Sequence, residues 1–83
     1  MGEVAYKNTN IDNLAIRKLE VTEFLLTAHI SDGRIVSIPI AWFERLRSAS
    51  LDQLKNFELS PSGYGVHWPD VDEDISVKAF LGF

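Results

Sequence analysis

Apolar and polar residues alternate on both sides of the turn sequence Ser31-Asp32-Gly33. The alternating apolar residues are Phe24, Leu26, Ala28 and Ile30 before the turn, and Val36, Ile38 and Ile40 after it. A period of two is typical of strands that turn one face toward a core. The two runs therefore predict a β-hairpin, and this hairpin restricts the fold more than any other feature of the sequence.

Parity decides the length of the loop in this hairpin. A three-residue loop, 31–33, pairs the inward residues with one another: Ala28 with Val36, Leu26 with Ile38 and Phe24 with Ile40. A two-residue loop would set Ile30 opposite Ile35 and would turn the second run to the wrong face. The longer loop also places Gly33 where the backbone needs a positive φ, which glycine adopts without strain. We therefore expect the three-residue loop.

A further strand is expected ahead of the hairpin, and a sheet edge at its end. From Leu14 to Val21 the apolar residues change phase midway, which predicts a strand with a bulge or kink near Arg17-Lys18. Pro39 has no N–H to donate, so its strand lies at the edge of the sheet or leaves the sheet there.

Two short helices are predicted after the hairpin. Residues 41–47 form the first, with Trp42 or Phe43 one turn from Leu46 and the charged residues turned toward water. The sequence Ser50-Leu51-Asp52-Gln53 matches a capping box, in which the first and last side chains each bond the backbone N–H of the other. A second helix from Leu51 to about Asn56 should follow.

A second hairpin is expected in the last third of the chain. Phe57 and Leu59 alternate into a brief strand, and Pro61-Ser62-Gly63 makes a turn. The returning strand turns three residues to one face: Tyr64, Val66 and Trp68. Residues 75–80 then supply further apolar side chains, and Gly82 is placed to end a terminal helical turn.

Together these elements predict an α+β fold, in which a small antiparallel sheet built from two hairpins plus a leading strand packs with two or three short helices. Residues 1–13 are polar and are expected to form a flexible lead, so residues 14–83 make a single domain. A chain of 83 residues can hold one core, and its hydrophobic fraction of 46% is enough to form one.

Composition excludes several classes of function. The net charge of −4, without clusters of Lys or Arg, argues against direct binding of nucleic acid by this chain alone. The absence of cysteine removes disulfides, thiolate catalysis and cysteine-based zinc sites. No apolar run is long enough to cross a membrane. We therefore expect a cytoplasmic protein that does not bind a membrane.

The stretch from Gly63 to Ile75 concentrates the unusual residues: two glycines, a histidine, a tryptophan, a proline and four acids. Within it, His67, Asp70, Asp72 and Asp74 gather one nitrogen and several oxygens, and zinc or another transition ion would bind through His67 plus one carboxylate. Calcium fits poorly, because the glycine and glutamate that an EF-hand loop requires are missing. The alternative is structural: the aspartates cap turns, and one of them holds the histidine.

Acid–base catalysis would use the same histidine, with Asp72 or Asp74 as the carboxylate that orients it. No nucleophile lies in a recognisable motif, and the sequence has no glycine-rich phosphate loop. A metal-dependent enzyme centred on His67 and the Asp70, Asp72 and Asp74 turn is therefore the alternative hypothesis. We expect no catalytic residue, no metal and no cofactor.

Binding of a protein partner is the function that we favour from the sequence. Aromatic residues with a polar atom dominate many interfaces, and a charged rim commonly surrounds them. The candidate contact residues are Trp42, Arg45, Tyr64, His67, Trp68, Asp70, Asp72 and Asp74. The alternative is that Trp42 and Trp68 belong to the core, and that Arg45 forms an internal salt bridge with Asp72 or Asp74.

The other face of the first hairpin carries His29 beside Leu25 and Thr27, with Ile35 across the hairpin. We expect His29 to be a half-exposed residue. The apolar residues on this face indicate that it is partly covered, either by a helix or by a second copy of the chain. Homodimerisation through this face is therefore one expectation.

Three segments are similar to a known bacterial family: Asp32-Gly33-Arg34, the run from Ile38 to Leu46, and the run from Gly65 to Val77. Over residues 14–81 the chain resembles the family described as domain of unknown function 2442. It departs from the family pattern at Glu44, where a proline is frequent. The resemblance implies a compact α+β fold made of a small antiparallel sheet and short helices.

The resemblance also implies a biological setting. Some relatives carry a helix-turn-helix domain after this module, and many are encoded beside another small protein in an arrangement similar to toxin–antitoxin pairs. We therefore expect a non-enzymatic binding module, a regulatory or antitoxin-like accessory protein, whose macromolecular partner is encoded nearby.

Overall fold

The computed structural model describes residues 13–82. Within this range six strands form two three-stranded antiparallel sheets, in the orders β1-β2-β3 and β4-β5-β6. The strands are β1 (Ile16–Val21), β2 (Leu25–Ile30), β3 (Ile35–Pro39), β4 (Glu58–Leu59), β5 (Gly65–Trp68) and β6 (Glu73–Ser76). The helical segments are the 3-10 helix η2 (Ile40–Trp42) and the α-helices α2 (Glu44–Arg47), α3 (Leu51–Lys55) and α4 (Val77–Phe80).

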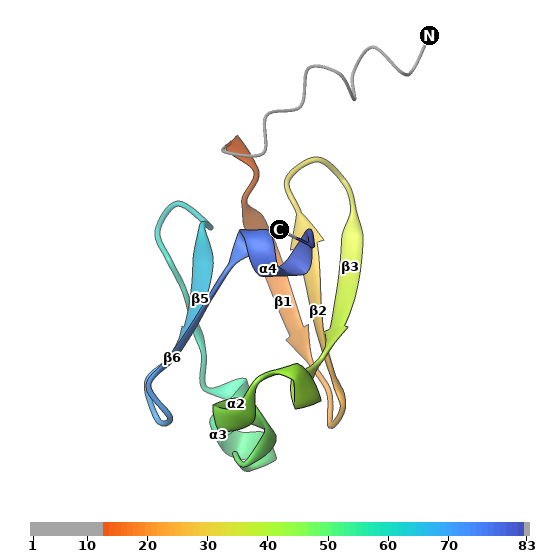
Figure 1. Ribbon diagram of the computed structural model, residues 1–83. Coiled ribbons are helices and arrows are strands. Elements are labelled where there is room, and N and C mark those ends of the chain that lie inside the picture. Colours follow the sequence, from red (N-terminus) through yellow and green to blue (C-terminus); the bar gives the residue numbers. More distant parts are fainter. Residues whose placement is uncertain (1–12, 83) are drawn as a thin grey trace, which may run out of the picture.

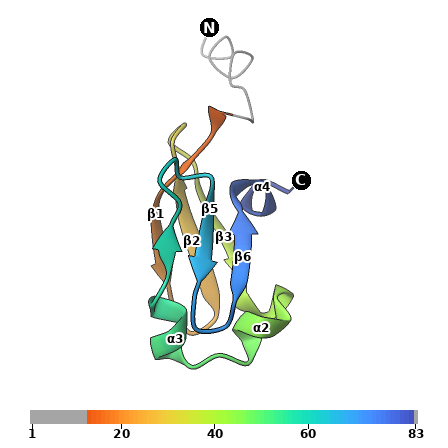
Figure 2. The ribbon, with the colours of Figure 1, turned by 90° about the vertical axis from the view of Figure 1, so that its left-hand side faces the viewer.

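The two sheets face each other, with α2 and α3 at one end and α4 toward the other (Figures 1 and 2). One core lies between them and draws on both sheets and all three α-helices. Its buried residues include Leu26, Ala28, Ile38, Leu46, Leu54, Val66, Trp68, Ile75, Val77 and Phe80. The predicted α+β class is confirmed, although the strands are divided between two sheets where the sequence suggested one.

The first sheet has the predicted register. β2 and β3 pair through the inward residues, Leu26 with Ile38 and Ala28 with Val36. The N–H of Ile30 donates to the carbonyl of Arg34 at 2.8 Å, which leaves the three residues 31–33 in the loop. Gly33 has a φ of +99°, as the loop type requires. The predicted register and the three-residue loop are therefore confirmed.

The edges of this sheet also follow the sequence. The register of β1 shifts between Ile16 and Lys18, where the change of apolar phase predicts a bulge. β1 begins two residues later than Leu14, the first residue of the predicted strand. β3, which ends at Pro39, is the other edge strand of the sheet.

Phe24 departs from the prediction, because its side chain is 72% exposed and not part of the core row. Its backbone pairs as expected, with the N–H of Ile40 donating to its carbonyl at 2.9 Å. The strand, however, begins only at Leu25, because Thr22 closes a turn just before it. The Thr22 hydroxyl accepts the N–H of Leu25 at 3.0 Å. Phe24 therefore lies in a turn at the end of the sheet.

The predicted helix over residues 41–47 is interrupted. Phe43, between η2 and α2, has an extended backbone with φ −119° and ψ 112°. Phe43 is half-buried while Trp42 is exposed, so Phe43 is the aromatic residue that turns toward the core. The capping box of α3 is confirmed: Ser50 Oγ accepts from the N–H of Gln53, and Gln53 Oε1 accepts from the N–H of Ser50.

β4 and β5 form the predicted second hairpin. Tyr64, predicted on the same strand face as Val66 and Trp68, lies just before β5 and is 51% exposed, so it does not share their burial. A strand that the sequence did not predict, β6, pairs with β5 and sets Ile75 opposite Val66. After α4, Gly82 has a φ of +85°, which agrees with its predicted role at the end of a helical turn.

A backbone hydrogen bond joins the two hairpin systems. The N–H of Ile16, at the start of β1, donates to the carbonyl of Gly63, in the turn before β5, at 2.6 Å. This bond holds the first strand of one sheet beside the hairpin of the other.

The predicted flexible lead, residues 1–13, lies outside the described residues except for Asn13. Among residues 13–82, none of the helices is long and apolar enough to cross a membrane.

Candidate functional site

The eight candidate contact residues do not form one surface. Trp68 is in the core, and Tyr64 lies at the end of the sheets near α4, where its carbonyl accepts the N–H of Val77 at 2.8 Å. His67 and Asp74 lie on the outer face of the second sheet. The remaining residues, Trp42, Arg45, Asp70 and Asp72, lie in or beside the helices and the turn between β5 and β6.

Trp68 has no exposed surface. Its indole Nε1–H donates to the carbonyl of Leu54 at 2.8 Å, and its ring lies 6.4 Å from that of Phe57, centroid to centroid. The hypothesis that Trp68 contacts a partner is therefore wrong for this fold, and the core alternative holds.

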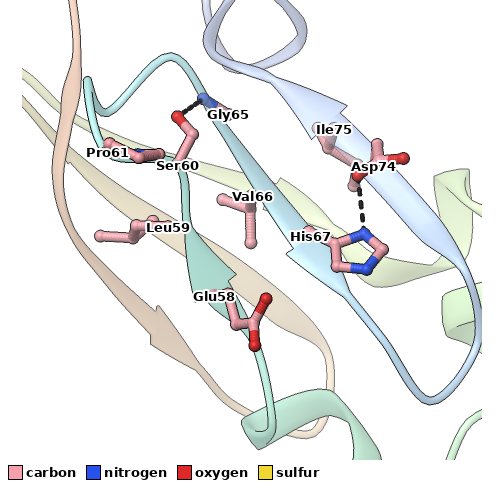
Figure 3. A pocket seen from close by; sticks show the side chains of 9 residues that line it. All are labelled: Glu58, Leu59, Ser60, Pro61, Gly65, Val66, His67, Asp74 and Ile75. Carbon is pink, nitrogen blue, oxygen red and sulfur yellow. Dashed lines mark hydrogen bonds and ion pairs between the residues drawn. The ribbon is translucent and has the colours of Figure 1, made fainter.

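His67 and Asp74 form a pair on the outer face of the second sheet. They are opposite each other on β5 and β6, and His67 Nδ1 lies 2.7 Å from Asp74 Oδ1 (Figure 3). The histidine is thus held by one of the aspartates, as the structural alternative states. The carboxylate orients the ring so that Nε2 points away from Asp74. Glu58 lies opposite His67 on the third strand, β4.

A depression of about 250 Å³ lies beside this pair. It is lined by Glu58, Leu59, Ser60, Pro61, Gly65, Val66, His67, Asp74 and Ile75 (Figure 3). Gly65 is needed here, because a Cβ at this position would lie 2.9 Å from the carbonyl oxygen of Ile75. The N–H of Gly65 donates to Ser60 Oγ at 3.1 Å, so that hydroxyl is already engaged in holding the hairpin.

The other two aspartates have separate partners. Asp70 Oδ2 accepts from Asn56 Nδ2 at 3.0 Å. Arg45 Nη1 donates to the carbonyl of Asp72 at 2.5 Å and lies 4.0 Å from Asp72 Oδ2, which bears out the internal salt bridge to the acidic turn. Asp72 has a φ of +53°, as short polar residues in turns tolerate.

These partners separate two of the four residues named in the metal hypothesis from His67. Asp70 and Asp72 turn to α3 and α2, while Asp74 turns to His67. Within residues 13–82, no three or more His, Asp or Glu side chains gather as a metal site would require. The structure therefore brings together a His–Asp pair and not a four-ligand cluster.

One end of the molecule carries two exposed aromatic side chains. Phe24 and Trp42 are 72% and 66% exposed, and their segments are joined by the hydrogen bond between Ile40 and Phe24. A depression of about 230 Å³ at this end is lined by Glu23, Phe24, Ile40, Ala41 and Arg47. Phe24 was not among the predicted contact residues, because the alternating pattern places it in the core row; the signal for its exposure is Thr22, which closes a turn just before it.

The outer face of the first sheet is open to solvent within the described residues. Leu25 is 40% and Ile35 63% exposed, so no described helix covers them. His29 is half-buried as expected, and its Nε2 lies 2.9 Å from Glu20 Oε1. This hydrogen bond, reinforced by the charge of Lys18, holds the pKa of the Glu20 carboxyl below its usual value.

Comparison with protein families identifies the family to which this fold belongs. A family model described as "Protein of unknown function (DUF2442)" matches residues 16–82, which span both sheets. The chain belongs to this family. The DUF2442 resemblance, which the three segments 32–34, 38–46 and 65–77 carry in the sequence, is thereby confirmed. A comparison with curated proteins found no match.

Two solved structures share the DUF2442 chain's fold. A crystal structure of a protein of unknown function from Rhodospirillum rubrum is 25% identical, with a TM-score of 0.73 over 83% of this chain and 86% of that one. A solution NMR structure of an uncharacterised protein from Chromobacterium violaceum is 19% identical, with a TM-score of 0.69 over 98% of this chain and 72% of that one. The second likeness concerns the fold alone.

Proposed function

We propose that this DUF2442 chain is a non-enzymatic, cytoplasmic binding module that engages a protein partner through the end of the molecule carrying Phe24 and Trp42. The observation that carries the proposal is the exposure of these two large aromatic side chains on adjoining segments, beside a depression that Arg47 and Glu23 border. Aromatic side chains bury about 150–250 Å² each when they are covered, so both together offer a large gain on binding.

The charged residues around the aromatic pair fit this role. Arg45 ties α2 to the acidic turn and still has a mostly exposed guanidinium group, so this end combines apolar anchors with both signs of charge. Interfaces commonly surround aromatic anchors with a polar rim that excludes water. We propose further that the chain acts as a regulatory or antitoxin-like accessory protein. The gene arrangement that the family resemblance implies supports this role.

Co-purification with the product of the neighbouring gene tests the proposal. Phe24→Ala and Trp42→Ala should each weaken the complex while the melting temperature stays near that of the wild type, because neither side chain is in the core. Tyr64→Ala is the matched control, since it removes another exposed aromatic side chain at the opposite end. A complex that survives Phe24→Ala and Trp42→Ala and is lost with Tyr64→Ala would contradict the proposed surface.

The alternative, a metal-dependent enzyme, has weaker support. It is centred on His67 and the Asp70, Asp72 and Asp74 turn, and of these aspartates only Asp74 contacts His67, while Asp70 and Asp72 are engaged by Asn56 and Arg45. The depression beside His67 contains a histidine that a carboxylate orients, which is one component of acid–base catalysis. The Ser60 hydroxyl nearby accepts a backbone N–H and lies in no arrangement typical of a nucleophile.

A further inference from the structure

We propose that the exposed edge of β1 is a homodimer interface, in which two copies of β1 pair antiparallel around Leu19 and join the first sheets of both molecules into one. This inference goes beyond the proposed partner surface, which lies at the end of the sheets, and it uses different residues. It rests on the backbone direction of β1 and on the charges that flank Leu19.

The backbone groups of Leu19 and Val21 point away from the sheet. The N–H of Thr22 donates to the carbonyl of Leu25, and the register continues through Glu20 opposite Thr27. Hydrogen-bonded pairs alternate with non-bonded pairs in an antiparallel ladder. The backbone N–H and carbonyl groups of a residue in a non-bonded pair therefore point away from the neighbouring strand. By this alternation the backbone N–H and carbonyl groups of Leu19 and Val21 face away from β2, along the outer edge of the sheet.

The side chains on either side of Leu19 complement a second copy of themselves. Lys18 and Glu20 are exposed on the outer face, one residue before and one after Leu19. If two β1 strands pair antiparallel with Leu19 opposite Leu19, Lys18 of each copy lies opposite Glu20 of the other. Opposite charges directly across a strand pair stabilise it, and the two outward Leu19 peptide groups form a pair of hydrogen bonds.

The other sheet edges fit a second copy less well. β3 contains Pro39, which lacks an N–H, and α4 packs near this strand. β4 has two residues. β6 would bring Asp74 against Asp74 of the second copy, and like charges directly opposite destabilise a strand pair. β1 is the longest of these edges, with six residues, and its bulge, between Ile16 and Lys18, lies outside the central pairs formed by Lys18, Leu19 and Glu20.

Charge reversal tests the interface. Sedimentation of the full chain over a wide range of concentration should show a dimer, and Lys18→Glu or Glu20→Lys should each weaken it roughly tenfold or more, because two attractive pairs become repulsive. A mixture of the two variants should restore dimerisation, since every pair across the interface is again of opposite charge. Glu58→Lys, an exposed reversal on β4, is the matched control and should leave the dimer unchanged.

Hydrogen exchange of the wild type gives a second measurement that needs no variant. The amide of Leu19 should become protected as the protein concentration rises, while the outward amides of Ile35 and Ser37 on β3 should not. A monomer at every concentration would overturn the proposal. A dimer that tolerates both reversals, that is not restored by mixing them, or that protects β3 in place of β1 would overturn it as well.

Discussion

Trp68 is the largest fully buried side chain of the described structure, and its indole nitrogen is satisfied by the carbonyl of Leu54. Removing the ring leaves a cavity between the second sheet and α3. We expect Trp68→Ala to lower the free energy of unfolding by about 3–5 kcal/mol. Urea denaturation followed by circular dichroism measures this change.

Two further variants test how much of this loss comes from the hydrogen bond and how much from burial of the ring. Trp68→Phe keeps much of the apolar volume and loses the indole hydrogen bond, so its cost should be smaller than that of the alanine variant. Trp42→Ala removes an exposed ring and should change the free energy of unfolding little. Equal costs for Trp42→Ala and Trp68→Ala would contradict the assignment of one ring to the surface and the other to the core.

Asp32 makes stability depend on pH. The Arg34 guanidinium donates to Asp32 Oδ2 at 2.7 Å, and this hydrogen bond holds the pKa of the carboxyl below its ordinary value of 3.8. A carboxyl whose pKa is lower in the folded chain stabilises the fold above its unfolded pKa, and this stabilisation is lost as the pH falls through the folded pKa.

We therefore expect Asp32→Asn to be less stable than the wild type at neutral pH and to approach it as the pH falls below 3.8. Melting temperatures of both proteins across this range measure the difference, which should be small because the pair lies at the surface. A difference that grows toward acid pH would have the wrong sign for this mechanism.

At the level of elements, the contact between the start of β1 and the turn before β5 depends on Gly63. Its φ is +75°, and an added Cβ would lie 2.8 Å from both the Cβ of Ala15 and the carbonyl oxygen of Ile16. Gly33 has a similar φ of +99°, but an added Cβ would meet no atom within 4 Å. Substituting Gly33 therefore introduces backbone strain alone, whereas substituting Gly63 introduces backbone strain and a steric clash.

We expect Gly33→Ala to cost about 1–2 kcal/mol, the strain of a left-handed residue with a side chain. Gly63→Ala should cost more, because the same strain is joined by a clash where the two sheets meet. Chemical denaturation of the two variants side by side tests the order. A larger loss for Gly33→Ala would mean that the contact near Ile16 yields easily.

The aspartates in and after the turn between β5 and β6 have different partners, and this predicts weak or no binding of metal ions. Adding Zn²⁺ or Mn²⁺ to chelated protein should leave the melting temperature unchanged, because Asp70 and Asp72 do not face His67. A bound ion would raise it by RT ln(1 + [L]/Kd). A rise that disappears in His67→Ala would restore the metal hypothesis.

The elements that could be predicted from the sequence are those with local signals. The 31–33 loop follows from parity and a glycine, and the α3 cap follows from Ser50 and Gln53. β6 could not be predicted in this way, because only Ile75 of its four residues is buried and the others are polar or acidic. Its pairing with β5 depends on a partner strand and not on its own pattern.

At the scale of the whole molecule, the division into two facing sheets is the feature that no local pattern contains. Alternation identifies which residues turn inward, but it does not show which sheet each strand belongs to. The same alternating pattern therefore fits a single sheet and two facing sheets equally well. The same limit applies to the candidate site. Residues 67–74 are adjacent in sequence, yet the strand pairing places His67 with Asp74 and leaves Asp70 and Asp72 to the helices.

The contrast between the two tryptophans gives the chain two built-in optical reporters. Trp68, sealed in an apolar environment, should emit at shorter wavelength and resist iodide, while Trp42 should emit like a solvated indole and be quenched. Denaturant should therefore red-shift the first signal, and a ligand docking beside η2 should shield the second. One fluorescence experiment can thus distinguish loss of structure from occupancy of the surface, without attaching a dye.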